Sequence, residues 1–282
     1  MLAILLFALG FPAADGLLKS WDVFSLIFFR NVLGFGFLII LASIWLGPIR
    51  LLELPWFKGT VVGAIGFGTG SVMLLVAQSI SNAITAALAA ACMPIFAVLL
   101  EVLLDKRAMS MRFIFSIILV ITGGGIATGM SPKEFNLSIG LAVGLLASAI
   151  FAWGSRTTVK SFPELSPLER TIITSLGMFL FCMLVWLFVF LEFPERIFIP
   201  FSIIENSLLL FIYCIVALAI SQILWISAVA DVGVGIASFH LNAAPFYVMI
   251  ILYFLGSDWD WIQTFGVILL TIGTINAQLK NF

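Results

Sequence analysis

The feature that most constrains the fold is a succession of long apolar runs, separated by short stretches that hold most of the charged residues. A helix needs about 20 apolar residues to cross a bilayer. Reading the runs between charges, Pro and Gly predicts ten spans, over residues 2–18, 24–46, 56–79, 82–104, 112–130, 137–159, 168–191, 206–229, 233–255 and 261–279. We therefore expect an all-α integral membrane protein with ten transmembrane helices, embedded in a lipid bilayer.

Composition excludes several other classes of protein. Charged residues make up 10% of the chain, whereas about 25% is usual in soluble proteins. A net charge of −1 without a basic tract argues against a nucleic-acid partner. The single histidine rules out a multi-histidine metal centre, and the three cysteines lie singly in apolar runs. We therefore expect no metal, no cofactor and no disulfide framework.

The distribution of Lys and Arg predicts the orientation of the chain, because cytoplasmic loops carry an excess of positive charge. A cytoplasmic N-terminus places nine Lys or Arg residues on the inner side and four on the outer side. This excess predicts that both termini are cytoplasmic.

The two halves of the sequence resemble each other. A shift of 151 residues aligns Ala77 with Ala228, Ala86 with Ala237 and Pro94 with Pro245, and near the front of each half Phe7-Ala-Leu-Gly10 matches Phe151-Ala-Trp-Gly154 and Arg30 matches Arg170. We predict one five-helix copy over residues 1–134 and a second over 135–282. Because five is odd, the second copy is expected to be inverted, an arrangement typical of secondary transporters with a substrate site near the midplane.

The first predicted helix is short. Only nine residues precede Gly10, whereas the matching span has about 16 residues before Gly154. We expect the native chain to start upstream of Met1, which the intact mass of the native protein would test.

The order of these features resembles the drug/metabolite transporter superfamily, in particular its EamA-type ten-helix transporters. The resemblance rests on the aromatic-Gly boxes that end at Gly10 and Gly154, the arginines at the start of the second helix of each copy, and the Ala-rich fourth helix with Pro94 at its centre. It implies a bacterial inner-membrane carrier that exports amino acids, related metabolites or toxic compounds. It also implies a central cavity lined by helices 1, 3, 4, 6, 8 and 9.

Polar and aromatic residues inside the spans are the candidate cavity residues, because polar groups within a membrane usually face a cavity or a partner helix. For each of them, hydrogen bonding between helices or core packing is the alternative. Ser71 and Gln222 correspond under the repeat. The predicted substrate-binding residues are Ser71, Gln78, Trp153, Gln222, Trp225, His240, Asn242 and Tyr247.

Three charged residues are candidates for coupling or gating: Asp15, Glu101 and Arg156. A salt bridge between Asp15 and Lys19 and snorkelling of Arg156 to the surface are the alternatives. The matching arginines, Arg30 and Arg170, are expected to anchor the bilayer interface. Pro94 and Pro245 are expected to let their helices bend.

The leading interpretation is a secondary transporter, an exporter of small metabolites such as amino acids, acting by alternating access around a midplane cavity. The cavity is expected to be mostly neutral, which disfavours strongly anionic substrates. Export of cationic drugs and uptake by the same fold stay open as alternatives, and an intramembrane enzyme or a channel is the alternative of a different class. No ATP-binding motif is present, no catalytic residues are predicted, and the expected state is a monomer or homodimer.

Overall fold

A computed structural model of the chain describes residues 1–104, 111–127, 135–198 and 206–278. These residues are predominantly helical and include no strand, which confirms the all-α prediction. The helices of the first half are α1 (Leu2–Leu17), α2 (Val23–Trp45), α3 (Gly47–Leu52), α4 (Trp56–Val62), η1 (Gly63–Gly68), α5 (Thr69–Ile80), α6 (Ala83–Ala91), α7 (Met93–Leu104) and α8 (Met111–Ala127). Those of the second half are α9 (Phe135–Ser161), α10 (Pro167–Glu192), η2 (Pro194–Arg196), α11 (Ser207–Leu210), η3 (Phe211–Ile220), α12 (Ser221–Phe239), η4 (His240–Ala243), α13 (Ala244–Phe254) and α14 (Trp261–Gln278).

Six helical segments of the described chain are long and apolar enough to cross a membrane: Val23–Trp45, Trp56–Ile80, Ala83–Leu104, Ile139–Ser161, Pro167–Glu192 and Ser207–Phe254. Three shorter apolar helices accompany them, over Leu2–Leu17, Ile114–Gly124 and Trp261–Asn276. The last of the six has 48 residues, about twice the length of one crossing. It contains Gly233, whose φ of 82° interrupts the helical backbone. The number of crossings therefore stays a prediction.

Two kinds of helix irregularity occur in both halves. The segment from Trp56 to Ile80 includes the π-helix η1, and the segment from Ser207 to Phe239 includes the π-helix η3. A turn at Cys92 separates α6 from α7, and the 3-10 helix η4 separates α12 from α13. Each of these breaks lies just before a proline, Pro94 or Pro245, because a proline within a helix removes a backbone hydrogen bond.

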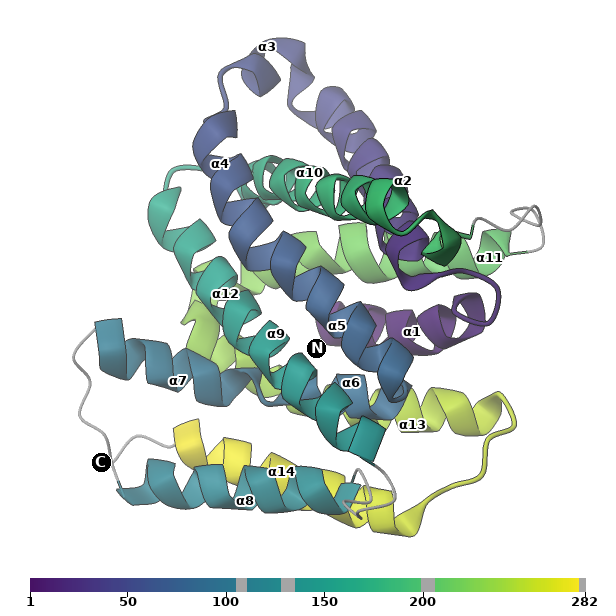
Figure 1. The fold of residues 1–282 in the computed structure, drawn as a ribbon. Coiled ribbons are helices and arrows are strands. Elements are labelled where there is room, and N and C mark those ends of the chain that lie inside the picture. Colours follow the sequence, from purple (N-terminus) through teal and green to yellow (C-terminus); the bar gives the residue numbers. More distant parts are fainter. Residues whose placement is uncertain (105–110, 128–134, 199–205, 279–282) are drawn as a thin grey trace.

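The helices form a bundle in which α8 and α14 pack along each other at one side, while α2, α4 and α10 lie together at the other (Figure 1). Close approach in the centre depends on small residues. A Cβ atom built on Gly66 of η1 would lie 2.5 Å from Cα of Gly154 of α9, so the two backbones touch there. Such contacts between small residues are typical of membrane helices.

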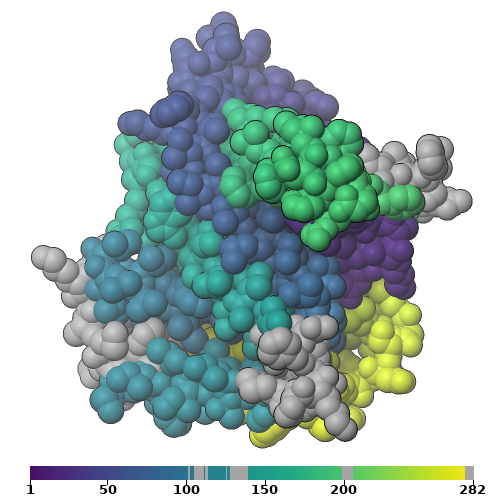
Figure 2. Space-filling view, viewed as in Figure 1, coloured from purple at the N-terminus to yellow at the C-terminus, as the bar shows by residue number. Residues whose placement is uncertain are grey.

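Helices of both halves form the surface of the bundle (Figure 2). Many large hydrophobic side chains are exposed on this surface; Phe57 and Phe254, for example, are 83% and 82% exposed. Soluble monomers rarely expose such extensive apolar surface, and a bilayer accounts for it. The interior holds a buried cluster rich in alanine, to which α1, α6, α9, α12 and α13 contribute.

Candidate functional site: a cavity between the two halves

A cavity with a volume of about 80 Å³ lies inside the bundle, and we call it the central cavity. A water molecule needs about 10–15 Å³ of such space, so the cavity has room for about six. It is lined by Ala3, Ile4, Phe7, Arg30, Phe67, Ser71, Leu74, Ala90, Met93, Ser148, Phe151, Ser155, Ala217, Leu218, Ser221, Gln222, Trp225 and Leu241. The two halves of the chain thus contribute equally to its wall.

Most of the lining residues form pairs under the sequence repeat. The shift of 151 residues pairs Phe67 with Leu218, Ser71 with Gln222, Leu74 with Trp225 and Ala90 with Leu241, and the aligned aromatic-Gly boxes pair Ile4 with Ser148 and Phe7 with Phe151. Both members of each pair face the same cavity. The helix contacts repeat as well, because Gly10 packs on Ala217 as Gly154 packs on the equivalent Gly66.

Three residues predicted to bind substrate line the central cavity: Ser71, Gln222 and Trp225. The Ser71 hydroxyl donates to the sulfur of Met178 at 3.4 Å, and the Trp225 indole N–H donates to the Ser155 hydroxyl at 2.9 Å. The Nε2 atom of Gln222 is buried and has no hydrogen-bond partner. Burying a hydrogen-bond donor without an acceptor costs free energy, so this atom is an unsatisfied donor in the cavity wall.

Arg30 also lines the central cavity, although its place near the start of the second helix predicted an interfacial anchor. Its side chain is only 8% exposed. The guanidinium carbon lies 4.7 Å from the centroid of the Tyr213 ring, and the buried Nε atom has no hydrogen-bond partner. A cation inside a membrane costs about 2.5–3.5 kcal/mol on insertion scales, so such residues usually serve function.

Arg170, which matches Arg30 in the repeat, is also buried but lies outside the central cavity. Its Nε donates to the carbonyl of Phe162 at 2.8 Å, and its NH2 group donates to the carbonyl of Pro163 at 2.7 Å. These bonds hold the loop between α9 and α10 against the start of α10. Arg170 therefore has a structural role that Arg30 lacks.

Gln78 lies beyond one end of the central cavity. Its side-chain amide donates to the carbonyl of Phe11 at 2.7 Å and to the carboxylate of Asp15 at 2.6 Å. On one side it borders a small cavity of about 20 Å³ that shares Arg30 and Ser71 with the central cavity. On the other side it borders a wider space of about 550 Å³, the vestibule, which is lined by Asp15, Leu18, Lys19, Trp21, Asp22, Val23, Phe24, Gln78, Ser79, Ser81, Asn82 and Arg196. Gln78 thus separates the vestibule from the interior.

Four other predicted substrate-binding residues lie outside these cavities. His240 is half-buried in η4 and stands edge-on to the ring of Phe239. Asn242 is buried and accepts a hydrogen bond from Thr274 at 2.7 Å, while Tyr247 packs against the alanine-rich cluster. Trp153 is half-buried beside Gly66. Their roles in binding stay predictions.

Of the three candidates for coupling and gating, the structure describes the side chains of Asp15 and Arg156. Asp15 borders the vestibule, whereas Arg156 is half-buried on α9 away from all three cavities. The side chain of Glu101 lies outside the described residues. Pro94 and Pro245 both lie in the first turn after a helix break. Among the described residues, no group of three His, Cys, Asp or Glu side chains is arranged to hold a metal ion.

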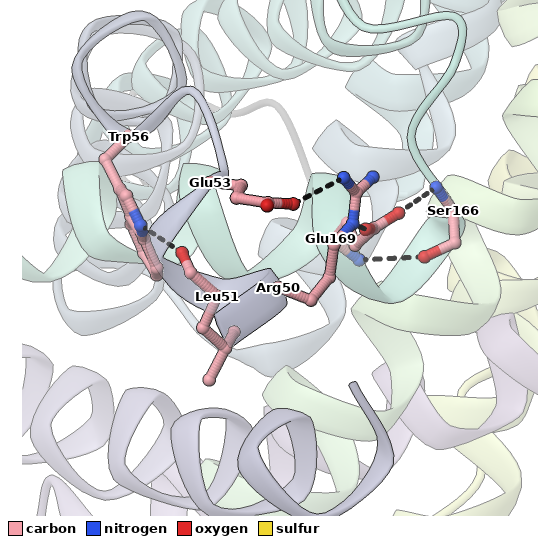
Figure 3. Close-up of polar contacts among 6 residues, drawn as sticks. All are labelled: Arg50, Leu51, Glu53, Trp56, Ser166 and Glu169. Carbon is pink, nitrogen blue, oxygen red and sulfur yellow. Dashed lines mark hydrogen bonds and ion pairs between the residues drawn. The ribbon is translucent and has the colours of Figure 1, made fainter. Parts of the chain in front are cut away.

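A polar cluster joins the two halves at a distance from the cavity (Figure 3). The Nε atom of Arg50, on α3, donates to the carboxylate of Glu169 at 2.7 Å, and Glu53 approaches Arg50 at 3.4 Å. Glu169 also accepts from the backbone N–H of Ser166 and thereby completes the capping box of α10. The hydrogen bond to Glu169 raises the pKa of Arg50 above its ordinary value.

Long apolar helices, an apolar surface and a cavity between the halves define a multi-pass membrane protein of the transporter class. The model of the EamA-like transporter family matches residues 1–128 and again residues 138–277. The chain therefore belongs to the EamA-like transporter family, as its sequence features predict, and is a membrane transporter.

Solved structures show the same fold. One of 23 matching chains, titled "Crystal structure of protein", has a TM-score of 0.72 and 17% sequence identity. The match covers 98% of this chain and 94% of that one. No curated protein matches this chain.

The sequence reasoning missed most of the cavity wall, including Arg30, Ser148, Ser155 and Ser221. Among the described residues that line the cavity, Arg30 alone lies outside the six helices that the resemblance implies. One signal for it was present. Arg30 is the eighth residue of the largely apolar 23-residue helix α2, which is too deep for a simple interfacial anchor.

Proposed function

We propose that this protein is a secondary transporter with ten transmembrane helices in two inverted five-helix copies, which exports small metabolites such as amino acids by alternating access. In this proposal both termini are cytoplasmic and the membrane is a bacterial inner membrane. The protein acts as a monomer or homodimer, and a small-molecule substrate binds in the central cavity.

The observation that carries the proposal is the pairing of residues around the central cavity. Ser71 faces it from the first half and Gln222 from the second, and the same correspondence holds for Phe7 and Phe151. A cavity between two related copies is the arrangement in which one copy can rock against the other around a fixed site.

The helix irregularities support alternating access. The π-helix η1 lies directly before the helix turn that carries Ser71, and η3 lies directly before the turn that carries Gln222. π-helical turns inside α-helices are frequent at functional sites. The breaks at Cys92 and at η4 provide places where α6 and α12 can change direction relative to α7 and α13.

The alternatives differ in the charge and direction that they require. Export of a cationic drug would favour a carboxylate in the cavity wall, but among the described residues the wall has none and includes Arg30. An uptake carrier would share every feature named above. A channel would favour a ring of charges or carbonyls. An enzyme would favour a nucleophile beside a base, but the Ser71 hydroxyl donates to the sulfur of Met178 and not to a base.

Flux into proteoliposomes tests the proposal. We expect saturable counterflow of a labelled small metabolite, such as an amino acid, that empty liposomes lack. Ser71→Phe should abolish it, because the ring fills the cavity. Ser43→Phe is the matched control, since Ser43 is an exposed serine on α2. Equal flux through both variants, or counterflow of lipophilic cations alone, would contradict the proposal.

A further inference from the structure

The hydrogen bonds of the central cavity can be accounted for group by group. Its polar wall consists of four serines, Arg30 and Gln222. Ser71 bonds to Met178, Ser148 donates to the carbonyl of Ala89 at 2.7 Å, Ser155 accepts from Trp225, and Ser221 donates to the carbonyl of Ala217 at 2.8 Å. Three of the four hydroxyls therefore donate within the protein, and that of Ser155 accepts.

Arg30 and Gln222 differ from the serines because each keeps a buried nitrogen without any hydrogen-bond partner, the Nε of Arg30 and the Nε2 of Gln222, whereas each serine oxygen has one. They come from opposite halves of the chain, on α2 and α12. Buried unpaired donors are rare and point to a missing partner. Since both unmet groups are donors and one carries a positive charge, the missing partner is an anionic acceptor.

The wall further limits the chemistry of that partner. Phe7, Phe151 and Trp225 make much of it apolar, which suits an organic body. Among the described residues, no carboxylate lines the cavity to pair with an ammonium group. A planar guanidinium binds a carboxylate through two parallel hydrogen bonds, which suits this class of anion best.

We propose that Arg30 and Gln222 form a carboxylate-binding site, and that the substrate is a small organic anion whose carboxylate they hold while its apolar body packs on Phe7, Phe151 and Trp225. This inference rests on the proposed function, because the bound carboxylate is a substrate only if the protein transports it. It revises the expectation of a neutral cavity, and it makes Arg30 the residue that determines specificity for charge.

Binding to the full chain in detergent, measured by calorimetric titration at pH 7, tests the site apart from transport. The probes are isovalerate, its amide isovaleramide, valine, isobutylamine and chloride. We expect saturable binding of isovalerate, at least tenfold weaker binding of the amide, and none of the amine. Isovalerate should bind at least as tightly as valine, because the ammonium of valine gains no carboxylate partner.

The variants identify the residues. Arg30→Met should weaken isovalerate binding at least tenfold and change amide binding by less than twofold, which also shows that the cavity is intact. Arg30→Lys should restore part of the affinity. Gln222→Leu should weaken isovalerate binding three- to tenfold and keeps the test open if Arg30→Met does not fold. Trp45→Phe is the control, since Trp45 is exposed at the end of α2 and does not line the cavity, and should change nothing.

Several outcomes would overturn the inference. These are equal binding of isovalerate and its amide, valine binding more than tenfold tighter than isovalerate, preferred binding of the amine, and equal displacement by chloride. Binding that follows these expectations without flux in proteoliposomes would overturn the proposed function and leave the carboxylate site standing. Flux of a substrate that does not depend on Arg30 would overturn the carboxylate site and leave the proposed function standing.

Discussion

Arg30 and Arg170 occupy matching positions of the two halves, and both are buried, but their surroundings differ. Arg170 has two backbone carbonyls within hydrogen-bond distance, whereas Arg30 has the face of Tyr213 and an Nε without a partner. The same contrast extends along the repeat, because Gln78 of the first half corresponds to the apolar Val229 of the second. The two related copies thus share one framework, but Arg30 and Gln78 of the first copy border cavities while their counterparts in the second copy, Arg170 and Val229, do not.

The largest expected effect separates the two arginines by stability. Arg170→Met removes two hydrogen bonds from a charged donor and leaves two carbonyls unpaired, so we expect a loss of about 4 kcal/mol in unfolding free energy. Arg30→Met keeps the apolar stem and removes an unpaired charge, so stability should change by less than about 1 kcal/mol. Unfolding by SDS in mixed micelles measures both. Equal losses would mean that Arg30 is structural as well.

A second comparison concerns the glycine contacts that the two copies share. Gly154 of the second copy faces Gly66 of the first, whereas the equivalent contact joins Gly10 of the first copy to Ala217 of the second. Gly66→Ala would place a methyl group 2.5 Å from Cα of Gly154, and we expect it to cost about 1–3 kcal/mol because backbones must separate. The control is Gly36→Ala on α2, where nothing lies within 4 Å. Identical melting of the two variants would contradict close packing at this crossing.

A smaller effect is expected at Gln78, which separates the vestibule from the interior. Gln78→Val copies the second half at this position and removes the bonds to Phe11 and Asp15. A loss of about 1 kcal/mol shifts the opening equilibrium about fivefold, so a cysteine at Ser71 should react with a charged thiol reagent about five times faster. Gln263→Val on α14, which is not at the vestibule, is the control. No change in the labelling rate would show that Gln78 does not seal this path.

The smallest effect concerns Leu74 and Trp225, another pair of corresponding cavity residues. The Trp225 indole bonds to Ser155 and so joins α12 to α9, a contact that Leu74 cannot make. Trp225→Phe keeps an aromatic ring but loses this bond, and we expect a loss of about 1 kcal/mol in unfolding free energy. Trp153→Phe is the matched control, and we expect it to lose less unfolding free energy than Trp225→Phe. A larger loss for Trp153→Phe would show that packing, not this hydrogen bond, dominates.

The sequence by itself determined the class of the protein, because long apolar runs with few charges leave a membrane helix as the only way to satisfy the backbone. It also identified the family and the repeat, since the aromatic-Gly boxes and Pro94 with Pro245 depend on local pattern alone. The shift of 151 residues that relates the two halves also pairs Ser71 with Gln222, and both line the central cavity.

Only the tertiary structure decided which of two matching residues faces the cavity and which is held by its neighbours. A periodic pattern cannot show whether an acceptor from another segment lies within 3 Å, so Arg30 and Arg170 looked equivalent. It could not show that Gln78 reaches Asp15, or that His240 and Asn242 lie away from the cavities. Burial and hydrogen bonding depend on how distant helices pack, and that packing turns a similar pair of residues into an anchor and a candidate binding group.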